Sequence, residues 1–148
     1  MIYDGAQNIT WLDYTAPVNS WTNQFHWANE PTVTYNSKRL TGWSLPSISE
    51  LTNLYTELGN TLGAPLTNTT PFTQLQALNY WSGTAASANA DDTFNFSTGS
   101  EQQPSANALN YALAELPGNV VPTPIPAAFQ LFGSGLAALG ILRRRSEK

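Results

Sequence analysis

The chain has 148 residues, enough for one domain that buries roughly two-thirds of the surface exposed by its unfolded form. Charged residues make up only 11% of the sequence, so the exterior must rely on Asn, Thr, Ser and Gln. The chain has no cysteine, which excludes disulfides, a thiolate nucleophile and cysteine metal ligands.

Charge is distributed unevenly along the chain. Residues 1–121 contain two basic side chains, Lys38 and Arg39, against nine acidic ones, a net charge of −7. The other basic residues lie in the last six positions. Because binding to nucleic acid requires a basic stripe that neutralises phosphates, we exclude nucleic acid as a partner.

The first third of the chain predicts two short strands followed by a helix. Residues 2–4 alternate like a strand, residues 4–8 form a turn, and residues 9–12 form a second strand. Ser20 is placed to cap a helix that ends before Pro31. The helix carries Trp21, Phe25 and Ala28 on one flank and Trp27 on a neighbouring one. It also carries His26, the only histidine, and a lone histidine more often lies at a surface without chemistry.

Residues 42–59 contain the strongest local signals. Pro46 pushes the residue before it into an extended conformation, so the chain arrives there as a strand or an extended arm. Ser47 and Glu50 are spaced for a capping box, and Gly59 suits the left-handed turn that ends a helix. Between them, apolar residues recur at helical spacing and predict one buried face: Ile48, Leu51, Leu54, Tyr55 and Leu58.

The second half of the chain predicts strands separated by polar loops. Residues 61–73 form an irregular loop, residues 80–84 a strand and turn, and residues 85–92 a loop of small residues. The alternation after this loop places Phe94 and Phe96 on one face of a half-buried strand.

The end of this region completes the expected domain. Residues 99–106 form another polar loop, and residues 110–118 form a final strand that ends at Pro-Gly.

Several of these motifs together resemble the Lcl C-terminal domain family and its relatives with a C-type-lectin-like or formylglycine-enzyme-like core. The resemblance covers about residues 2–118. The matching stretches read Y-D-x-x-x-N-I-T-W-L at 3–12, S-W-x-x-x-x-x-W-A at 20–28, W-S-L-P-S-x-x-E-L at 43–51, Y-W-S-G-T at 80–84 and Y-A-L-A-E-L-P-G at 111–118.

The resemblance implies an α+β fold over residues 1–120, a small core with two helices and short antiparallel strands. Relatives usually have arginines in W-R-L-P and V-R-P-G, where this chain has Ser44 and Leu116. Any core ion pair or anion contact made by those arginines is therefore lost. Glycosaminoglycan binding, which the resemblance to family adhesins would otherwise imply, is not carried across to this chain.

The last 28 residues combine a linker, an apolar segment and a basic end. Residues 121–126 favour a polyproline spacer, and residues 127–142 carry no charge. As a helix, these sixteen residues would extend about 24 Å, just short of the ~30 Å hydrocarbon core of a membrane. The arginines at 143–145 would stay in the cytoplasm, ahead of a basic tail that ends at residue 148.

This order resembles the PEP-CTERM sorting signal, which implies an exosortase-type transpeptidase as partner. The protein would be exported, anchored in the bacterial inner membrane through the apolar helix, and then cut and released to the cell surface or matrix. Export also predicts a signal peptide of about 15–30 residues encoded upstream of Met1. A permanent anchor is the alternative. The residues that carry the signal are Val121, Pro122, Thr123, Pro124, Arg143, Arg144 and Arg145.

No arrangement of residues in the sequence predicts catalysis or a cofactor. With one histidine and no cysteine, a Ser-His-Asp triad would need His26 to be placed by chance, and the copper chemistry implied for formylglycine-generating relatives needs cysteines. Asp91 and Asp92, with Asn89 and Asn95, offer oxygen ligands for Ca²⁺, but adjacent acids in a polar loop are usually only solvated.

The leading hypothesis is a non-enzymatic module that binds extracellular polysaccharide or packs against like copies in the matrix. Exposed aromatic residues beside the loops would stack on sugar rings, with Trp81 the first candidate and Tyr80 and Asn95 beside it. The alternative is a hydrolase or oxidase on a lectin-like core, which requires a cleft with convergent titratable groups.

Overall fold

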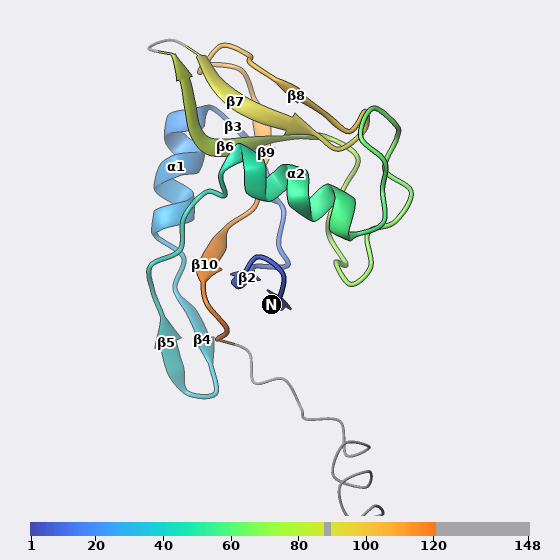
Figure 1. The fold of residues 1–148 in the computed structure, drawn as a ribbon. Helices are drawn as coiled ribbons and strands as arrows, with labels where there is room; N and C mark the ends of the chain where they lie inside the picture. The colour runs from blue at the N-terminus through green and yellow to red at the C-terminus, as the bar shows by residue number, and fades with distance from the viewer. Residues whose placement is uncertain (88–89, 121–148) are drawn as a thin grey trace, which may run out of the picture.

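The computed structural model describes residues 1–87 and 90–120, in which two helices and ten strands are found (Figure 1). The helices are α1 (Trp21–Asn29) and α2 (Ile48–Glu57). The strands are β1 (Ile2–Asp4), β2 (Ile9–Trp11), β3 (Ala16–Asn19), β4 (Val33–Tyr35), β5 (Lys38–Leu40), β6 (Asn79–Ser87), β7 (Ala90–Asn95), β8 (Ser100–Gln102), β9 (Asn110–Ala112) and β10 (Glu115–Pro117). The predicted α+β class, with two helices and mainly antiparallel strands, is confirmed.

The strands form two sheets and a separate hairpin. The larger sheet has the order β3-β9-β6-β7-β8, in which only β6 and β9 pair in parallel. The smaller sheet has the order β1-β2-β10, so the first strands of the domain pair with its last one. The hairpin of β4 and β5 turns through Asn36 and Ser37, both with positive φ, as a two-residue hairpin turn of type I′ requires.

Helix α2 begins and ends where the sequence predicts. The Ser47 hydroxyl accepts the Glu50 amide at 3.2 Å, and the Glu50 carboxylate accepts the Ser47 amide at 2.6 Å, which completes the capping box. Gly59 follows the helix with φ of +84°. The chain reaches Pro46 as an extended arm, in which Ser44 makes a single β-bridge to Glu115.

Helix α1 has the predicted position but a different cap and a different buried face. The Ser20 hydroxyl makes no capping bond; the Asn19 side chain instead accepts the Ser20 amide at 3.0 Å. Gln24 is buried and donates to the carbonyls of Pro17 and Asn110, whereas Phe25 is 39% exposed. Phe25, expected on one flank of the helix with Trp21 and Ala28, thus lies outside the core, and the neighbouring Gln24 is buried because its amide satisfies two carbonyls inside the fold.

The two helices cover opposite faces of the five-stranded sheet. Neighbouring residues of a strand point to opposite faces, and on β6 these are Tyr80 and Trp81. Tyr80 packs in the core under α2 with Phe94 and Phe96, as the alternation predicted for the two phenylalanines. Trp81 packs in the second core, with Ala28 of α1. Figure 1 shows α2 in front of the sheet and α1 at one end of it.

Some boundaries predicted for the second half are wrong. Strand β6 continues through the turn expected at its end, and β7 already begins inside the expected loop of small residues, because these two strands pair with each other as far as Ser87 and Ala90. Strand β8 lies inside the expected polar loop, where it completes the sheet edge by pairing Glu101 with Phe94. The final strand is two strands, because β9 pairs with β3 and β6 and β10 pairs with β2.

Candidate functional site

A cavity of about 170 Å³ lies between the N-terminal strand, the end of α2 and the loop that follows it. Its walls are largely apolar and come from β1, α2 and residues 70–72. Asp13 holds this loop in place, since its carboxylate accepts the Thr73 amide at 3.0 Å and the Thr73 hydroxyl at 2.7 Å. The wall residues are Ile2, Leu54, Leu58, Pro71 and Phe72.

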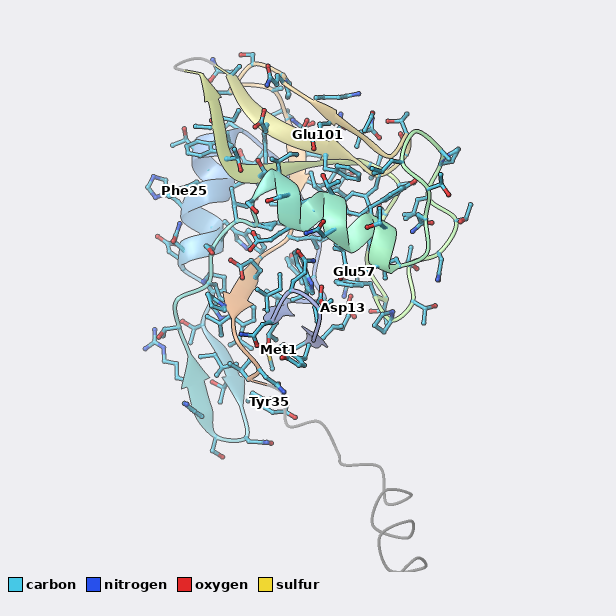
Figure 2. All side chains as sticks on the ribbon, viewed as in Figure 1. Met1, Asp13, Phe25, Tyr35, Glu57 and Glu101 are labelled. Carbon is cyan, nitrogen blue, oxygen red and sulfur yellow. The ribbon has the colours of Figure 1, made fainter. Side chains whose placement is uncertain are left out.

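Two carboxyl groups, Asp4 and Glu57, meet at the cavity. Asp4 ends β1 and accepts the amides of Ala6 and Gln7 at 3.0 and 3.1 Å, the geometry of a turn stabilised by an aspartate. The Gln7 side chain and the Trp11 indole also donate to it, at 3.0 and 3.3 Å. Glu57 lies in the last turn of α2 (Figure 2) and hydrogen-bonds the Asp4 carboxylate.

The pKa values of these two carboxyl groups shift in opposite directions. Desolvation of the part of Glu57 that borders the cavity raises its pKa to about 7, helped by its hydrogen bond to Asp4 and by the negative charge there. Partial burial also acts to raise the pKa of Asp4, but hydrogen bonds from Gln7, Glu57 and Trp11 outweigh it and lower that pKa. Below about pH 7, Glu57 therefore carries the shared proton while Asp4 is the ionised partner.

The pair should make stability depend on pH. Glu57 has a pKa above its ordinary 4.5, so its contribution is complete below that value and is lost as the pH rises to about 7. Asp4 has a lowered pKa, so its contribution is lost as the pH falls below 3.8. The free energy of unfolding measured with urea should therefore fall by about 1 kcal/mol between pH 5 and pH 8. This value is discounted because solvent screens the exposed Glu57 side chain.

The Glu57→Gln variant isolates this effect from other groups, since Asp91 and Glu115 also have raised pKa values. Glutamine keeps a donor for Asp4 but cannot ionise. The difference in unfolding free energy between the chain and this variant should change with pH through about 7. If the difference in unfolding free energy stays constant across that range, Glu57 and Asp4 do not share a proton.

A second candidate surface lies on one flank of α1. The rings of Trp21 and Phe25 are stacked, with centroids 5.0 Å apart and planes 24° apart. The Trp21 indole donates to the Ser82 carbonyl at 2.9 Å, which fixes one ring, while Phe25 stays exposed (Figure 2). His26 adds an edge contact to Phe25, with centroids 6.2 Å apart. We call Trp21, Phe25 and His26 the α1 aromatic patch.

A second aromatic pair lies on the other flank of the helix. Tyr14 is 42% exposed and packs on the half-buried Trp27, with ring centroids 6.1 Å apart. Residues two positions apart on a helix are separated by about 200° around its axis, so Phe25 and Trp27 face in nearly opposite directions. The other exposed positions of α1 carry hydroxyl and amide groups rather than charges: Thr22, Asn23 and Asn29.

The aromatic residues predicted to stack on sugars are in the core. Trp81 and Tyr80 are both 0% exposed. The Trp81 indole donates to the Asn19 carbonyl at 2.9 Å, and Tyr80 packs edge-on against Phe96. The expectation that Trp81 is exposed is therefore wrong, because the strand that carries it is the centre of the five-stranded sheet. Asn95 beside them is half-buried, and its side chain accepts the amide and hydroxyl of Ser97 at 2.8 and 2.5 Å.

The weak calcium candidates show no arrangement suited to a metal. Asp91 is buried in β7, where burial and then the charge of Asp92 raise its pKa and favour its neutral form. Asn89 lies outside the described residues. Across residues 1–87 and 90–120, no three His, Asp or Glu side chains gather in a way that could hold a metal ion.

Ser44 and Leu116, the two departures from the expected arginine pattern, lie beside the buried Glu115: Ser44 pairs with it in a β-bridge, and Leu116 follows it in β10 and packs in the second core. The Ser44 hydroxyl donates to Glu115 Oε1 at 2.8 Å, but Glu115 Oε2 has no hydrogen-bond partner in the described part of the chain. Burial raises the pKa of Glu115, the Ser44 hydrogen bond only partly offsets this, and the charge of Glu50 adds to it. A neutral carboxyl group is the form suited to this site. Leu116 is 7% exposed and packs as an apolar residue.

The predicted sorting residues, Val121 to Pro124 and Arg143 to Arg145, and the expected apolar helix at 127–142 all lie outside the described residues. Within the part of the chain that is described, neither helix has the length and the apolar character needed to cross a membrane. Comparison with known protein families and with curated proteins found no match to this chain.

Sequence reasoning missed the Asp4 and Glu57 pair. The two residues are far apart in the chain, and neither belongs to a catalytic motif. The turn signal at Asp4 was visible, but it explains only the bonds that this carboxylate makes to its own turn. The α1 aromatic patch was partly visible, since its residues were grouped on one helix.

Proposed function

We propose that this chain is a non-enzymatic module that binds a neutral extracellular polysaccharide through the α1 aromatic patch. The observation that carries the proposal is the stacked pair of Trp21 and Phe25, one ring fixed and the other exposed. An exposed ring held in place offers a flat apolar face at a low cost in conformational entropy, which suits the C–H face of a sugar. The hydroxyl and amide groups around it suit the sugar hydroxyls.

Charge favours a neutral ligand over an anionic one. Lys38 and Arg39 are the two Lys or Arg residues in the domain, both lie on the β4–β5 hairpin, and nine acidic residues oppose them. An anionic polysaccharide would therefore meet net repulsion.

The finer assignment of the fold, a C-type-lectin-like core, is part of this proposal and is supported by the two helices and the pairing of the first and last strands.

The enzymatic alternative draws less support from the site. The Asp4 and Glu57 carboxyl groups hydrogen-bond each other directly, whereas glycoside hydrolases keep their two carboxyl groups about 5 to 9.5 Å apart. His26 is exposed on α1 and contacts Phe25, and among residues 1–87 and 90–120 it makes no bond to a nucleophile or a carboxylate. A binding role is the better account of these residues.

A glycan array tests the proposal. The full chain should bind at least one neutral polysaccharide, and raising the salt concentration should leave that binding unchanged, because salt screens only charged contacts. The Phe25→Ala variant should bind about tenfold more weakly, the loss expected for one stacked ring. The Leu109→Ala variant removes an exposed apolar side chain elsewhere and should bind as before. Retention of anionic glycans alone, or equal loss in both variants, would contradict the proposal.

We also propose that the chain is exported and sorted by its tail. The support is the order of proline spacer, uncharged segment and arginine cluster over residues 121–145. An exosortase-type enzyme would cut near residues 121–124 and release the domain from its membrane anchor. Intact-mass measurement of protein from the cell surface should show a chain without residues 127–148. A chain that still ends at Lys148 and dissolves only in detergent would show a permanent anchor instead.

A further inference from the structure

The cavity beside α2 has the size of a small organic ring and one polar end. Its volume of about 170 Å³ is close to that of an engineered protein cavity of about 150 Å³ that binds benzene. Ile2, Leu54 and Phe72 supply apolar walls, and Asp4 and Glu57 supply the carboxyl groups. A ligand that fills it needs an apolar body the size of one six-membered ring and one polar group.

The polar end is acidic and has no basic partner. Asp4 is fixed by bonds from Ala6, Gln7 and Trp11, so its carboxylate cannot turn away from the cavity without breaking them. The titratable groups that line the cavity beside Glu57 are Asp4 and Tyr3, and of the described residues no Lys, Arg or His lines it. The proton that Glu57 shares with Asp4 neutralises only one of the two carboxyl groups, so the pair keeps a negative charge.

We propose that this cavity binds a small organic ammonium ion, whose N–H groups donate to the carboxylates of Asp4 and Glu57. An ammonium group has three donors and a full positive charge, so it can replace the shared proton as the bridge between the two carboxylates. On binding, Glu57 releases its proton to solvent and the ammonium nitrogen takes that place. The apolar body of the ligand then packs against Leu54 and Phe72.

Competition with the shared proton gives the site a pH dependence of its own. The pKa of Glu57 is raised to about 7 by burial and by Asp4, whereas a primary ammonium keeps its charge up to about pH 10. Affinity should therefore fall about tenfold for each pH unit below 7 and level off above it.

Calorimetry on the full chain with cyclohexylammonium, and with cyclohexanol as the neutral probe of the same shape, tests the site. We expect a Kd on the order of 1 mM for the ammonium at pH 8, a realistic affinity for so small a ligand, and at least tenfold weaker binding of the alcohol. At pH 6, titrations in buffers of different ionisation enthalpy should show the release of close to one proton per bound ligand. Equal affinity for both probes, or no binding of either, overturns the proposal.

Two glutamine variants separate a binding role from a structural one. Glu57→Gln should weaken cyclohexylammonium binding about tenfold at pH 8 and abolish its pH dependence, because the amide has no proton to release. Glu30→Gln makes the same charge change at an exposed position after α1 and should leave both affinity and pH dependence unchanged. If Glu57→Gln keeps the pH dependence of the unchanged chain, the shared proton is not the group displaced, and the proposal fails.

Discussion

Replacing Trp81 by alanine should destabilise the domain by about 3–5 kcal/mol, the range for removing a fully buried large aromatic side chain. The ring is 0% exposed and packs in the second core with Leu45 and Ala112. Its indole also donates to the Asn19 carbonyl, so the truncation removes a bond that ties β6 to the end of β3. A domain of this size has a total stability of about 5–15 kcal/mol, so much of it would be lost.

Urea unfolding followed by intrinsic fluorescence and by circular dichroism measures this loss. Leu109→Ala is the control, because that side chain is 65% exposed and its truncation should change the free energy of unfolding by less than about 0.5 kcal/mol. A Trp81→Ala variant that unfolds at the same urea concentration as the unchanged chain, yet loses binding to a glycan, would restore Trp81 as a ligand-binding residue.

Replacing Gly99 by alanine should cost about 2–4 kcal/mol. Gly99 has φ of +62°, a conformation that costs an alanine about 1–2 kcal/mol. An added Cβ would also come within 2.8 Å of Tyr55 Cε1 and 3.0 Å of the Ala64 carbonyl oxygen. Tyr55 cannot move aside easily, because it is fully buried and its hydroxyl donates to the same Ala64 carbonyl.

Gly118→Ala separates the two causes of this cost. Gly118 also has positive φ, at +83°, but nothing lies within 4 Å of the position its Cβ would take. The variant should therefore lose only the conformational part, about 1–2 kcal/mol. Equal losses of unfolding free energy at the two positions would show that the close approach to Tyr55 carries no cost.

Features set by a few neighbouring residues were predictable from the sequence. The start of α2 follows from Ser47 and Glu50, three residues apart, and its buried face follows from helical spacing. The burial of Phe94 and Phe96 follows from alternation alone. These predictions succeed because the capping bonds and the periodicity act within one element and need no knowledge of its partners.

Features that depend on distant partners were not predictable. Strand β8 is polar, and it forms because the edge of β7 is available to it. Trp81 is buried because β9 and β7 pair on both sides of its strand, and nothing in the local sequence specifies that. The cavity joins β1 to the end of α2, so the pairing of Asp4 with Glu57 is known only once both elements are placed.

The most direct test of the proposed function is an NMR titration of the full chain with the neutral glycan that binds best on the array. Binding through the α1 aromatic patch predicts that the largest shifts occur at the Trp21 indole N–H, which donates to Ser82, and at the ring protons of Phe25 and His26. The Trp81 indole signal, buried in the second core, should shift little. Shifts concentrated on other faces of the domain, with the signals of Trp21 and Phe25 unchanged, would contradict this account.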